Sequence, residues 1–311
     1  MDVVVLAAVA GLFALVTGMN DGGALLATGL KLPTVRPATG ILALVVMVAL
    51  VPLATHAVAL TFANRLATFD GPGGRIAMTI GVLAALTVVT VLSSRGRPTS
   101  LTLAIVGGLT GAGLGWGLPV SAEWVVLVLL VGMAAPFVGG LMAWPVTRIL
   151  MRTTTTRGLW RWHRVGFGLQ TVAYAANDGQ KMLAVFMIAF GLQDAPPQYT
   201  SLVAVLFGLG SLYGLPKAGR TLGQEIIASR PLHGVAAELA SSITVIGCAL
   251  AGMPVSMTQA LAGGLIGAGV AQGGGGRVRW YAAVKIAVAW LLTLPASALL
   301  AATVAFVLVS A

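Results

Sequence analysis

The stretch TGMNDGGALLATG, residues 17–29, places an Asn-Asp-Gly triplet inside an apolar segment long enough to cross a membrane. A second stretch, AYAANDGQKMLAVF at residues 173–186, repeats the triplet 157 residues later. Such a triplet is usually a surface turn. With apolar flanks, it instead puts a costly carboxylate in hydrocarbon, which typically marks an ion or substrate path. Two interrupted apolar segments at matching positions therefore point to a transporter binding site.

The composition is that of a membrane protein. Hydrophobic residues make up 58% of the chain, charged residues 8%, and the mean hydropathy is +0.98. A soluble domain carries about 25% charged residues. The net charge of +10 does not indicate a nucleic-acid partner, because the basic residues lie in short loops between apolar segments. We therefore expect an all-α polytopic protein of the plasma membrane, with the lipid bilayer as its surroundings.

About ten segments are long enough to span a bilayer. With ten crossings, one set of alternating loops holds fourteen Lys and Arg residues and the other only Arg65 and Arg75. The positive-inside rule then places the basic loops in the cytoplasm and both termini on the extracytoplasmic side. The segments are 3–30, 38–63, 76–93, 98–116, 122–147, 165–192, 199–215, 235–252, 254–271 and 281–309.

A second pair of motifs indicates an internal repeat. GRPTSLTLAIVGGLTGAG at 96–113 matches GMPVSMTQALAGGLIGAG at 252–269 in eleven positions, with an offset of 156. Five spans in each half make the halves enter the membrane from opposite sides, which is an inverted-topology repeat with interrupted helices near the midplane. The predicted organisation is a first repeat over 1–147, a basic cytoplasmic linker over 148–164 and a second repeat over 165–311.

Small residues recur every four positions within this motif pair. Spacing of this kind lets helix backbones approach closely in membranes. The expected contact residues are Gly107, Gly111 and Gly115 in the first half and Gly263, Gly267 and Ala271 in the second.

The acidic residues of the triplets are candidate cation ligands. A carboxylate in hydrocarbon must be paired, protonated or bound to a cation. Oxygen ligands from Asn and Asp suit Na⁺, for which Asp21 and Asp178 are the charged ligands, and a proton would serve as well. Glu238 either joins them, pairs with Lys285 or lies at the interface. The predicted cation-binding set is Asn20, Asp21, Asn177, Asp178 and Glu238.

Hydroxyl groups follow the prolines of the second motif pair. A helix that starts there offers hydroxyls and free N–H groups to an oxyanion, although helix capping and interhelical hydrogen bonding would use the same groups. Gln180 adds a neutral donor. Lys181 could neutralise Asp178, meet the anion or extend to the interface. The predicted anion-binding set is Ser100, Thr102, Gln180, Ser256 and Thr258.

Motifs of membrane enzymes and ATP-driven pumps are not found. The sequence contains no HExxH, GxSxG or P-loop pattern. Cys248 is the only cysteine, which excludes an intrachain disulfide and a thiolate metal cluster. We expect no enzymatic activity and no cofactor beyond a coupling Na⁺ or H⁺. A passive anion channel is an alternative class.

The chain resembles the PiT inorganic phosphate transporter family at these motifs. GMNDGGAL (18–25) and AANDGQK (175–181) are similar to the family signatures GANDVANA and GANDGQK. PTSLTL (98–103) and PVSMTQ (254–259) are similar to its P-x-S-T-T-H segments. The resemblance implies import of inorganic phosphate by Na⁺ or H⁺ symport, with the predicted anion set around phosphate and four residues around the ion: Asn20, Asp21, Asn177 and Asp178.

Five positions depart from the family pattern, and two of them are Leu101 and Met257, which replace the middle Thr of each P-x-S-T-T-H segment. Ala24 replaces the second Asn of the first signature, and Leu103 and Gln259 replace the terminal His of each P-x-S-T-T-H segment. These changes remove polar groups near the expected site, so sulfate or a neutral metal–phosphate complex is an alternative substrate. The sequence does not determine the oligomeric state, and a homodimer is compatible with it.

Overall fold

The first half of the chain consists of helices, and two of these helices end in a π-helical turn. A computed structural model describes residues 3–22, 25, 34–94, 99–218 and 230–311. The elements are α1 (Val3–Thr17), which continues into the π-helical turn η1 (Gly18–Gly22), α3 (Pro37–Ala54), α4 (Ala57–Leu60), which continues into the π-helical turn η2 (Thr61–Arg65), α5 (Gly71–Ser94), α6 (Leu101–Trp116) and α7 (Ala122–Thr153).

The second half follows a similar order. Its elements are α8 (Thr156–Tyr174), the π-helical turn η3 (Ala175–Gly179), α9 (Gln180–Phe190), α10 (Pro197–Ala218), α12 (Pro231–Leu250), α13 (Met257–Gly273), the 3-10 turn η4 (Gly275–Arg277) and α14 (Trp280–Ser310). The region predicted as a basic linker, 148–164, is the end of α7 and the start of α8, joined at Thr154 and Thr155. The Thr155 hydroxyl caps α8 by accepting from the Gly158 amide at 3.2 Å.

Six of the described helices are long and apolar enough to cross a membrane. They are Val3–Gly22, Pro37–Ala54, Gly71–Ser94, Ala122–Thr153, Pro231–Leu250 and Trp280–Ser310. Hydrocarbon requires every backbone polar group to be satisfied within the protein, and helices meet that requirement. Large apolar side chains such as Phe137, Leu141 and Leu299 are exposed, as expected for surfaces that face lipid. The prediction of an all-helical, multi-span membrane protein is confirmed.

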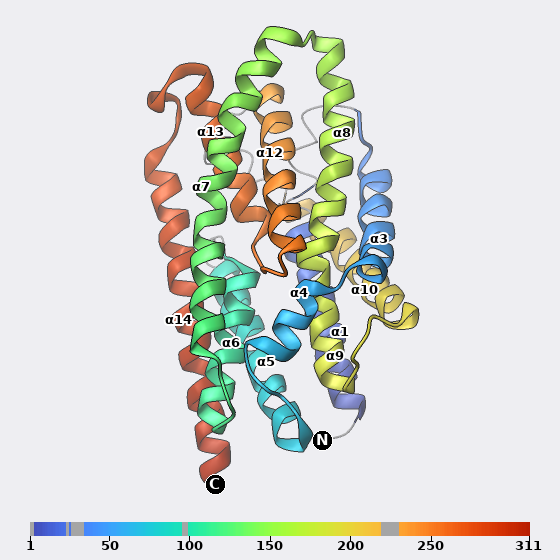
Figure 1. The fold of residues 1–311 in the computed structure, drawn as a ribbon, viewed down its shortest axis with the longest axis vertical. Coiled ribbons are helices and arrows are strands. Elements are labelled where there is room, and N and C mark those ends of the chain that lie inside the picture. Colours follow the sequence, from blue (N-terminus) through green and yellow to red (C-terminus); the bar gives the residue numbers. More distant parts are fainter. Residues whose placement is uncertain (1–2, 23–24, 26–33, 95–98, 219–229) are drawn as a thin grey trace.

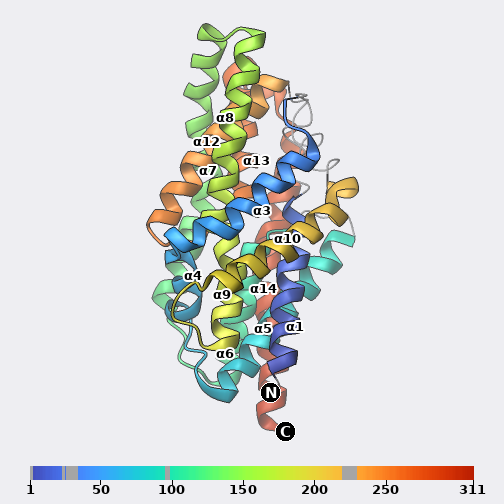
Figure 2. The same ribbon diagram turned by 90° about the vertical axis from the view of Figure 1, so that its right-hand side faces the viewer.

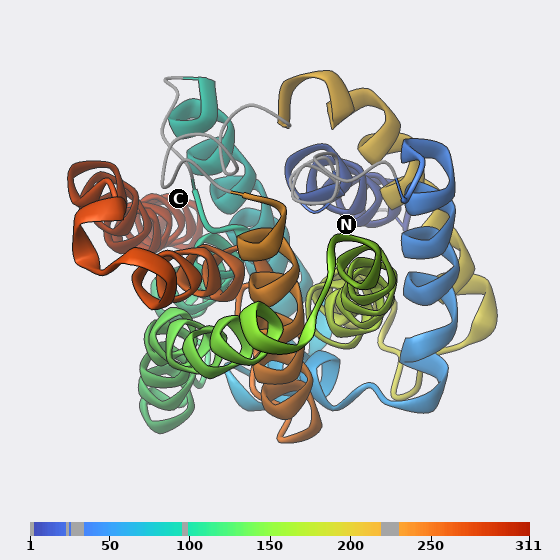
Figure 3. The same cartoon turned by 90° about the horizontal axis from the view of Figure 1, so that it is seen from above.

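Both chain ends lie at the same end of the molecule, and the α7–α8 connection lies at the opposite end (Figure 1). Figure 2 shows α3 and α10, which pack on each other, running obliquely across the other helices. Seen from above in Figure 3, the red and orange helices α13 and α14 lie across the molecule from the blue helices α1 and α3. The number of crossings stays a prediction. Four residues of the predicted basic loops lie outside the described residues: Lys31, Arg95, Arg97 and Arg220.

The two halves pack crosswise rather than side by side. Helix α6 packs along α14 and α13 along α7, while η1 packs on α10 and η3 on α3. In each of these pairs one element comes from the first half and its partner from the second. The core is therefore shared between the halves, and neither half buries its small-residue faces alone.

Glycines make the crosswise helix contacts possible. A Cβ at Gly107, Gly111 or Gly115 would meet the backbone of α14, and a Cβ at Gly263 or Gly267 would meet the backbone of α7. The contacted residues are Leu294, Ala298 and Ala302 on α14 and Pro136 and Gly140 on α7. The predicted close approach through small residues is confirmed for these five glycines.

Candidate ion and anion site

Both Asn-Asp-Gly triplets lie in π-helical turns. Asn20 and Asp21 belong to η1, and Asn177 and Asp178 belong to η3. The sequence predicts a break at each glycine, but η3 runs directly from α8 into α9, so there the helix is bulged and not broken. A π-helical turn shifts the backbone hydrogen-bond pattern by one residue and is frequent at functional sites. Each bulge turns its carboxylate into the protein interior, where both are buried.

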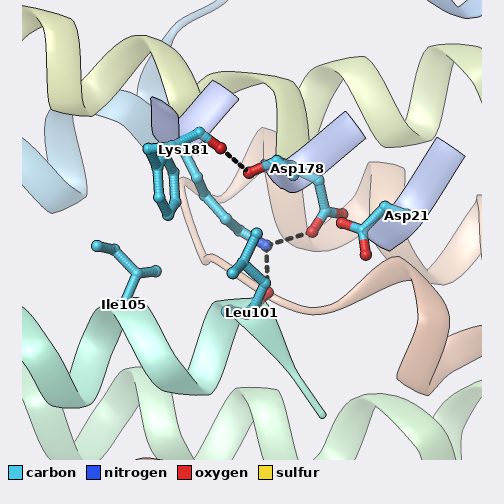
Figure 4. A pocket seen from close by; sticks show the side chains of 8 residues that line it. Asp21, Leu101, Ile105, Asp178 and Lys181 are labelled. Atoms are coloured by element: carbon cyan, nitrogen blue, oxygen red, sulfur yellow. Dashed lines mark hydrogen bonds and ion pairs between the residues drawn. The ribbon is translucent and has the colours of Figure 1, made fainter. Parts of the chain in front are cut away.

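Lys181 connects the two halves at the centre of the molecule. Its Nζ donates to Asp178 Oδ1 at 2.8 Å, to Thr102 Oγ1 at 2.6 Å and to the carbonyl oxygen of Val255. These acceptors come from η3, from the start of α6 and from the segment before α13. Figure 4 shows the Lys181 ammonium group beside the Asp178 carboxylate. Lys181 is only 4% exposed, so it does not extend to the interface.

Asp21 faces the same centre from the first half. Its Oδ1 accepts from Asn20 Nδ2 at 2.8 Å and its Oδ2 accepts from the Tyr174 hydroxyl at 3.2 Å. A small pocket lies between the two carboxylates and is shown in Figure 4. Its lining residues are Phe13, Thr17, Asp21, Leu101, Thr102, Ile105, Asp178 and Lys181. Two acidic groups that are 157 residues apart in sequence thus share one pocket.

Asn177 holds the connection between α12 and α13. Its Nδ2 donates to the carbonyl of Met253 at 3.0 Å, and its Oδ1 accepts from the Val255 amide at 3.0 Å. Directly afterwards, the Met257 amide at the start of α13 donates to Asp178 Oδ2 at 3.3 Å. The second triplet therefore fixes the position of the helix start that carries Ser256 and Thr258.

Gln180 binds the backbone at the interruption between α3 and α4. Its Oε1 accepts from the amides of Val58 at 2.8 Å and Ala59 at 3.2 Å, and its Nε2 donates to the carbonyl of Thr55 at 2.8 Å. The sequence predicts a segment over 38–63, which could be one span or a pair of half-helices, and does not locate the interruption at 55–56. In this structure the Gln180 amide satisfies backbone groups that the interruption leaves open.

The predicted anion-binding hydroxyls lie at the starts of two helices. Ser100 caps α6 by accepting from the Leu103 amide at 3.3 Å, and Thr102 accepts from Lys181. At the start of α13, the hydroxyls of Ser256 and Thr258 are hydrogen-bonded to each other at 2.9 Å. All four side chains are buried. The structure thus brings both hydroxyl pairs to helix starts that carry partners of Lys181 or Asp178.

Glu238 is not among the residues that line this pocket. It lies on α12, and its Oε2 is 2.8 Å from Nδ1 of His163 on α8. His163 precedes Asp178 by fifteen residues, roughly 22 Å along a helix at 1.5 Å per residue. The alternative partner Lys285 is exposed on α14. Sequence reasoning missed His163, although its spacing of seven and eleven residues from Gln170 and Tyr174 places all three on one helix face.

The fold and this centre define a helical membrane protein in which two helices with π-helical turns bring buried carboxylates to a shared pocket. A model of the phosphate transporter family matches residues 161–301. A probable low-affinity inorganic phosphate transporter of Bacillus subtilis (strain 168) is 24% identical over 95% of this chain and 94% of its own length. The protein of that name from Mycobacterium bovis is 32% identical over 67% of this chain, but only 54% of its own length is covered.

A solved structure, the sodium-dependent phosphate transporter, has the same fold. Its TM-score is 0.82 with 98% of both chains covered, at 18% sequence identity. The chain belongs to the phosphate transporter family. The resemblance to the PiT phosphate transporter family is thereby confirmed.

Proposed function

We propose that this protein is a secondary active transporter that imports inorganic phosphate by cation symport, with Na⁺ as the coupling ion and H⁺ as the alternative. The observation that carries the proposal is the pocket in which Asp21 and Asp178, from opposite halves, lie beside the Thr102 hydroxyl. The relatives named as phosphate transporters support the substrate. The solved relative described as sodium-dependent supports Na⁺.

Charge compensation explains why carboxylates and anion donors share one centre. Phosphate would lie among neutral hydroxyl and N–H donors at the starts of α6 and α13, where helix termini favour anions. The predicted donors are Ser100, Thr102, Gln180, Ser256 and Thr258. The carboxylates would repel phosphate unless a cation neutralises them, so ion and substrate would bind together. A filled site of lower net charge can then be carried more easily past a low-dielectric barrier.

The same proposal includes an inverted repeat of 1–147 and 165–311, joined by 148–164. The matching motif offsets of 156 and 157 support it, as do the crosswise packing and the π-helical turn at each triplet. The arginine-rich turn between α7 and α8 would face the cytoplasm of a plasma-membrane protein, and both termini the other side. The α7–α8 connection lies at one end of the molecule and both termini lie at the other, which supports this orientation (Figure 1).

Some predicted roles are not carried further by the geometry. Asn177 and Gln180 bind backbone groups in this conformation, so their roles as ion and anion ligands stay predictions. Glu238 as a further cation ligand also stays a prediction, since its carboxylate contacts His163. A homodimer stays a prediction as well.

Sulfate is the alternative anion, and a neutral metal–phosphate complex is a further one. The observation that favours an altered site is that Leu103 and Gln259 are buried near the starts of α6 and α13, where the family pattern has His. Loss of two imidazole groups removes donors that could distinguish protonation states of a tetrahedral anion.

The test is ³²P-phosphate uptake into proteoliposomes with an imposed Na⁺ gradient, an imposed proton gradient or neither. Concentrative uptake that needs one gradient and resists excess sulfate would establish a phosphate symporter and identify its ion. Flux without any gradient dependence would instead indicate a passive channel. Uptake abolished by sulfate, or absent altogether, would contradict phosphate as the substrate, and labelled sulfate would then be used.

A further inference from the structure

The ammonium group of Lys181 is bound in the way a metal cation is bound. It contacts a carboxylate oxygen of Asp178, the hydroxyl oxygen of Thr102 and the carbonyl oxygen of Val255. Three acceptors use all three N–H groups of a lysine side chain. Carboxylate and backbone carbonyl oxygens at interrupted helices are also the ligands that transporters use for Na⁺. A lysine head group is a compact point charge, so it can occupy such a position.

The corresponding position in the first half carries no such group. At the motif offset of 157, Lys181 corresponds to Ala24 in the sequence. The Asp21 carboxylate accepts hydrogen bonds from Asn20 and Tyr174, which are neutral donors. Among the described residues, the ion pairs are Lys181–Asp178 and His163–Glu238, and Asp21 takes part in neither. Two matching carboxylates therefore lie in electrically different surroundings.

Burial makes this difference consequential. An ionised carboxylate removed from water without an opposite charge is strongly disfavoured. Asp178 is paired with Lys181, three residues further along the same chain, and both side chains are buried. Asp21 is 4% exposed and faces the pocket, so an ion or proton from solution must supply its compensation.

We propose that Lys181 is a built-in cation that fills the ion position at Asp178, so that Asp21 alone takes the exchangeable coupling ion. This inference rests on the proposed cation symport and divides the two carboxylates between a permanent and an exchangeable charge. One coupling ion fewer then accompanies each anion than in a site where both carboxylates take ions from solution.

The experiment counts coupling ions per anion in proteoliposomes. Opposing gradients of phosphate and of the ion that drives uptake are varied until net flux is zero, at fixed pH when that ion is Na⁺, and the ratio is read from the balance point. Lys181→Met removes the charge while keeping a similar length. Lys285→Met is the matched control, because Lys285 is exposed on α14.

Wild type and Lys285→Met should give the same ratio, and Lys181→Met should give one more ion per anion. Adding Asp178→Asn to Lys181→Met should restore the wild-type ratio, because the freed site is removed again. An active Lys181→Met variant with an unchanged ratio would overturn the inference while leaving symport intact. Absence of gradient-driven uptake by wild type would instead count against the proposed function, so the two failures are distinguishable.

If the Lys181→Met variant does not fold, a second measurement on other variants tests the inference. Equilibrium binding of the driving ion, as ²²Na⁺ or as protons exchanged with a dilute buffer, is measured on purified protein. Asp21→Asn should abolish this binding, while the Asp178→Asn/Lys181→Met double variant should retain it. If the double variant loses binding and Asp21→Asn keeps it, the exchangeable ion is at Asp178 and the inference is wrong.

Discussion

The two Asn-Asp-Gly turns share a sequence and a backbone form but differ in their surroundings. In η1, Asn20 donates to its own neighbour Asp21, and the carboxylate has neutral partners. In η3, Asn177 fixes the segment before α13, and Asp178 pairs with Lys181. The comparison teaches that a repeated motif places a carboxylate, whereas a residue three positions further along decides whether its charge is already compensated.

The largest expected effect is on stability, when the same substitution is made in each turn. Asp178→Asn leaves the buried Lys181 ammonium without its opposite charge, which should lower the free energy of unfolding by about 3–5 kcal/mol. Asp21→Asn removes an uncompensated buried carboxylate, so it should leave stability unchanged or raise it. Thermal and denaturant unfolding in detergent, without added Na⁺ or phosphate, measures both. Equal losses in the two variants would mean that the turns are electrically alike.

The effect on transport should be larger for the substitution in η1, Asp21→Asn. Asp21→Asn should lower ion-dependent uptake by roughly 100-fold, equivalent to about 2.7 kcal/mol, because the exchangeable ion loses its charged ligand. Initial rates of ³²P-phosphate uptake against Na⁺ concentration measure this, with Lys285→Met as the folded control. Retained steep ion dependence in Asp21→Asn would contradict the assignment of the exchangeable ion to η1.

Packing provides a third contrast between the turns. Gly22 and Gly179 correspond at the motif offset, but a Cβ at Gly22 would overlap Ser211 on α10, whereas a Cβ at Gly179 makes only ordinary contacts, the nearest 3.6 Å from Val48. Gly22→Ala should therefore cost about 1–3 kcal/mol of stability. Gly179→Ala should be neutral or stabilising by up to about 1 kcal/mol, as for a glycine replaced within a helix. Unfolding in detergent compares the two, and equal costs would show that α10 yields to the added methyl group.

The smallest expected effect concerns the tyrosine that reaches across to the first turn. Tyr174→Phe removes the 3.2 Å hydrogen bond to Asp21 and keeps the ring against Phe207. Loss of a hydrogen bond to a charged group, worth about 1.5–3 kcal/mol at most, should change the apparent affinity for the coupling ion several-fold without changing the ion ratio. Tyr213→Phe is the control, since Tyr213 is exposed on α10. An unaltered ion affinity would place the exchangeable ion away from the Tyr174 side of Asp21.

Much of the architecture could be predicted because its signals are local or periodic. Long apolar segments predict membrane helices. The small-residue repeat predicts that α6 and α13 each approach another helix closely. The interruption at 55–56 was not located in advance because apolar residues lie on both sides of Thr55 and His56. Likewise, the triplet glycines predict a break, but the surrounding packing keeps η3 helical as a π-helical turn.

The sequence by itself determined the membrane class, the family and the pair of acidic positions, because composition and repeated motifs are properties of the linear chain. Only the tertiary structure decided the contacts of Lys181, for which the sequence allowed three positions: beside Asp178, beside the anion or at the interface. Two of its acceptors, Thr102 and Val255, lie 79 and 74 residues away in sequence. The same holds for the contact of Glu238 with His163, 75 residues apart. Which charges compensate each other depends on distances between helices, and crosswise packing of the two halves sets those distances.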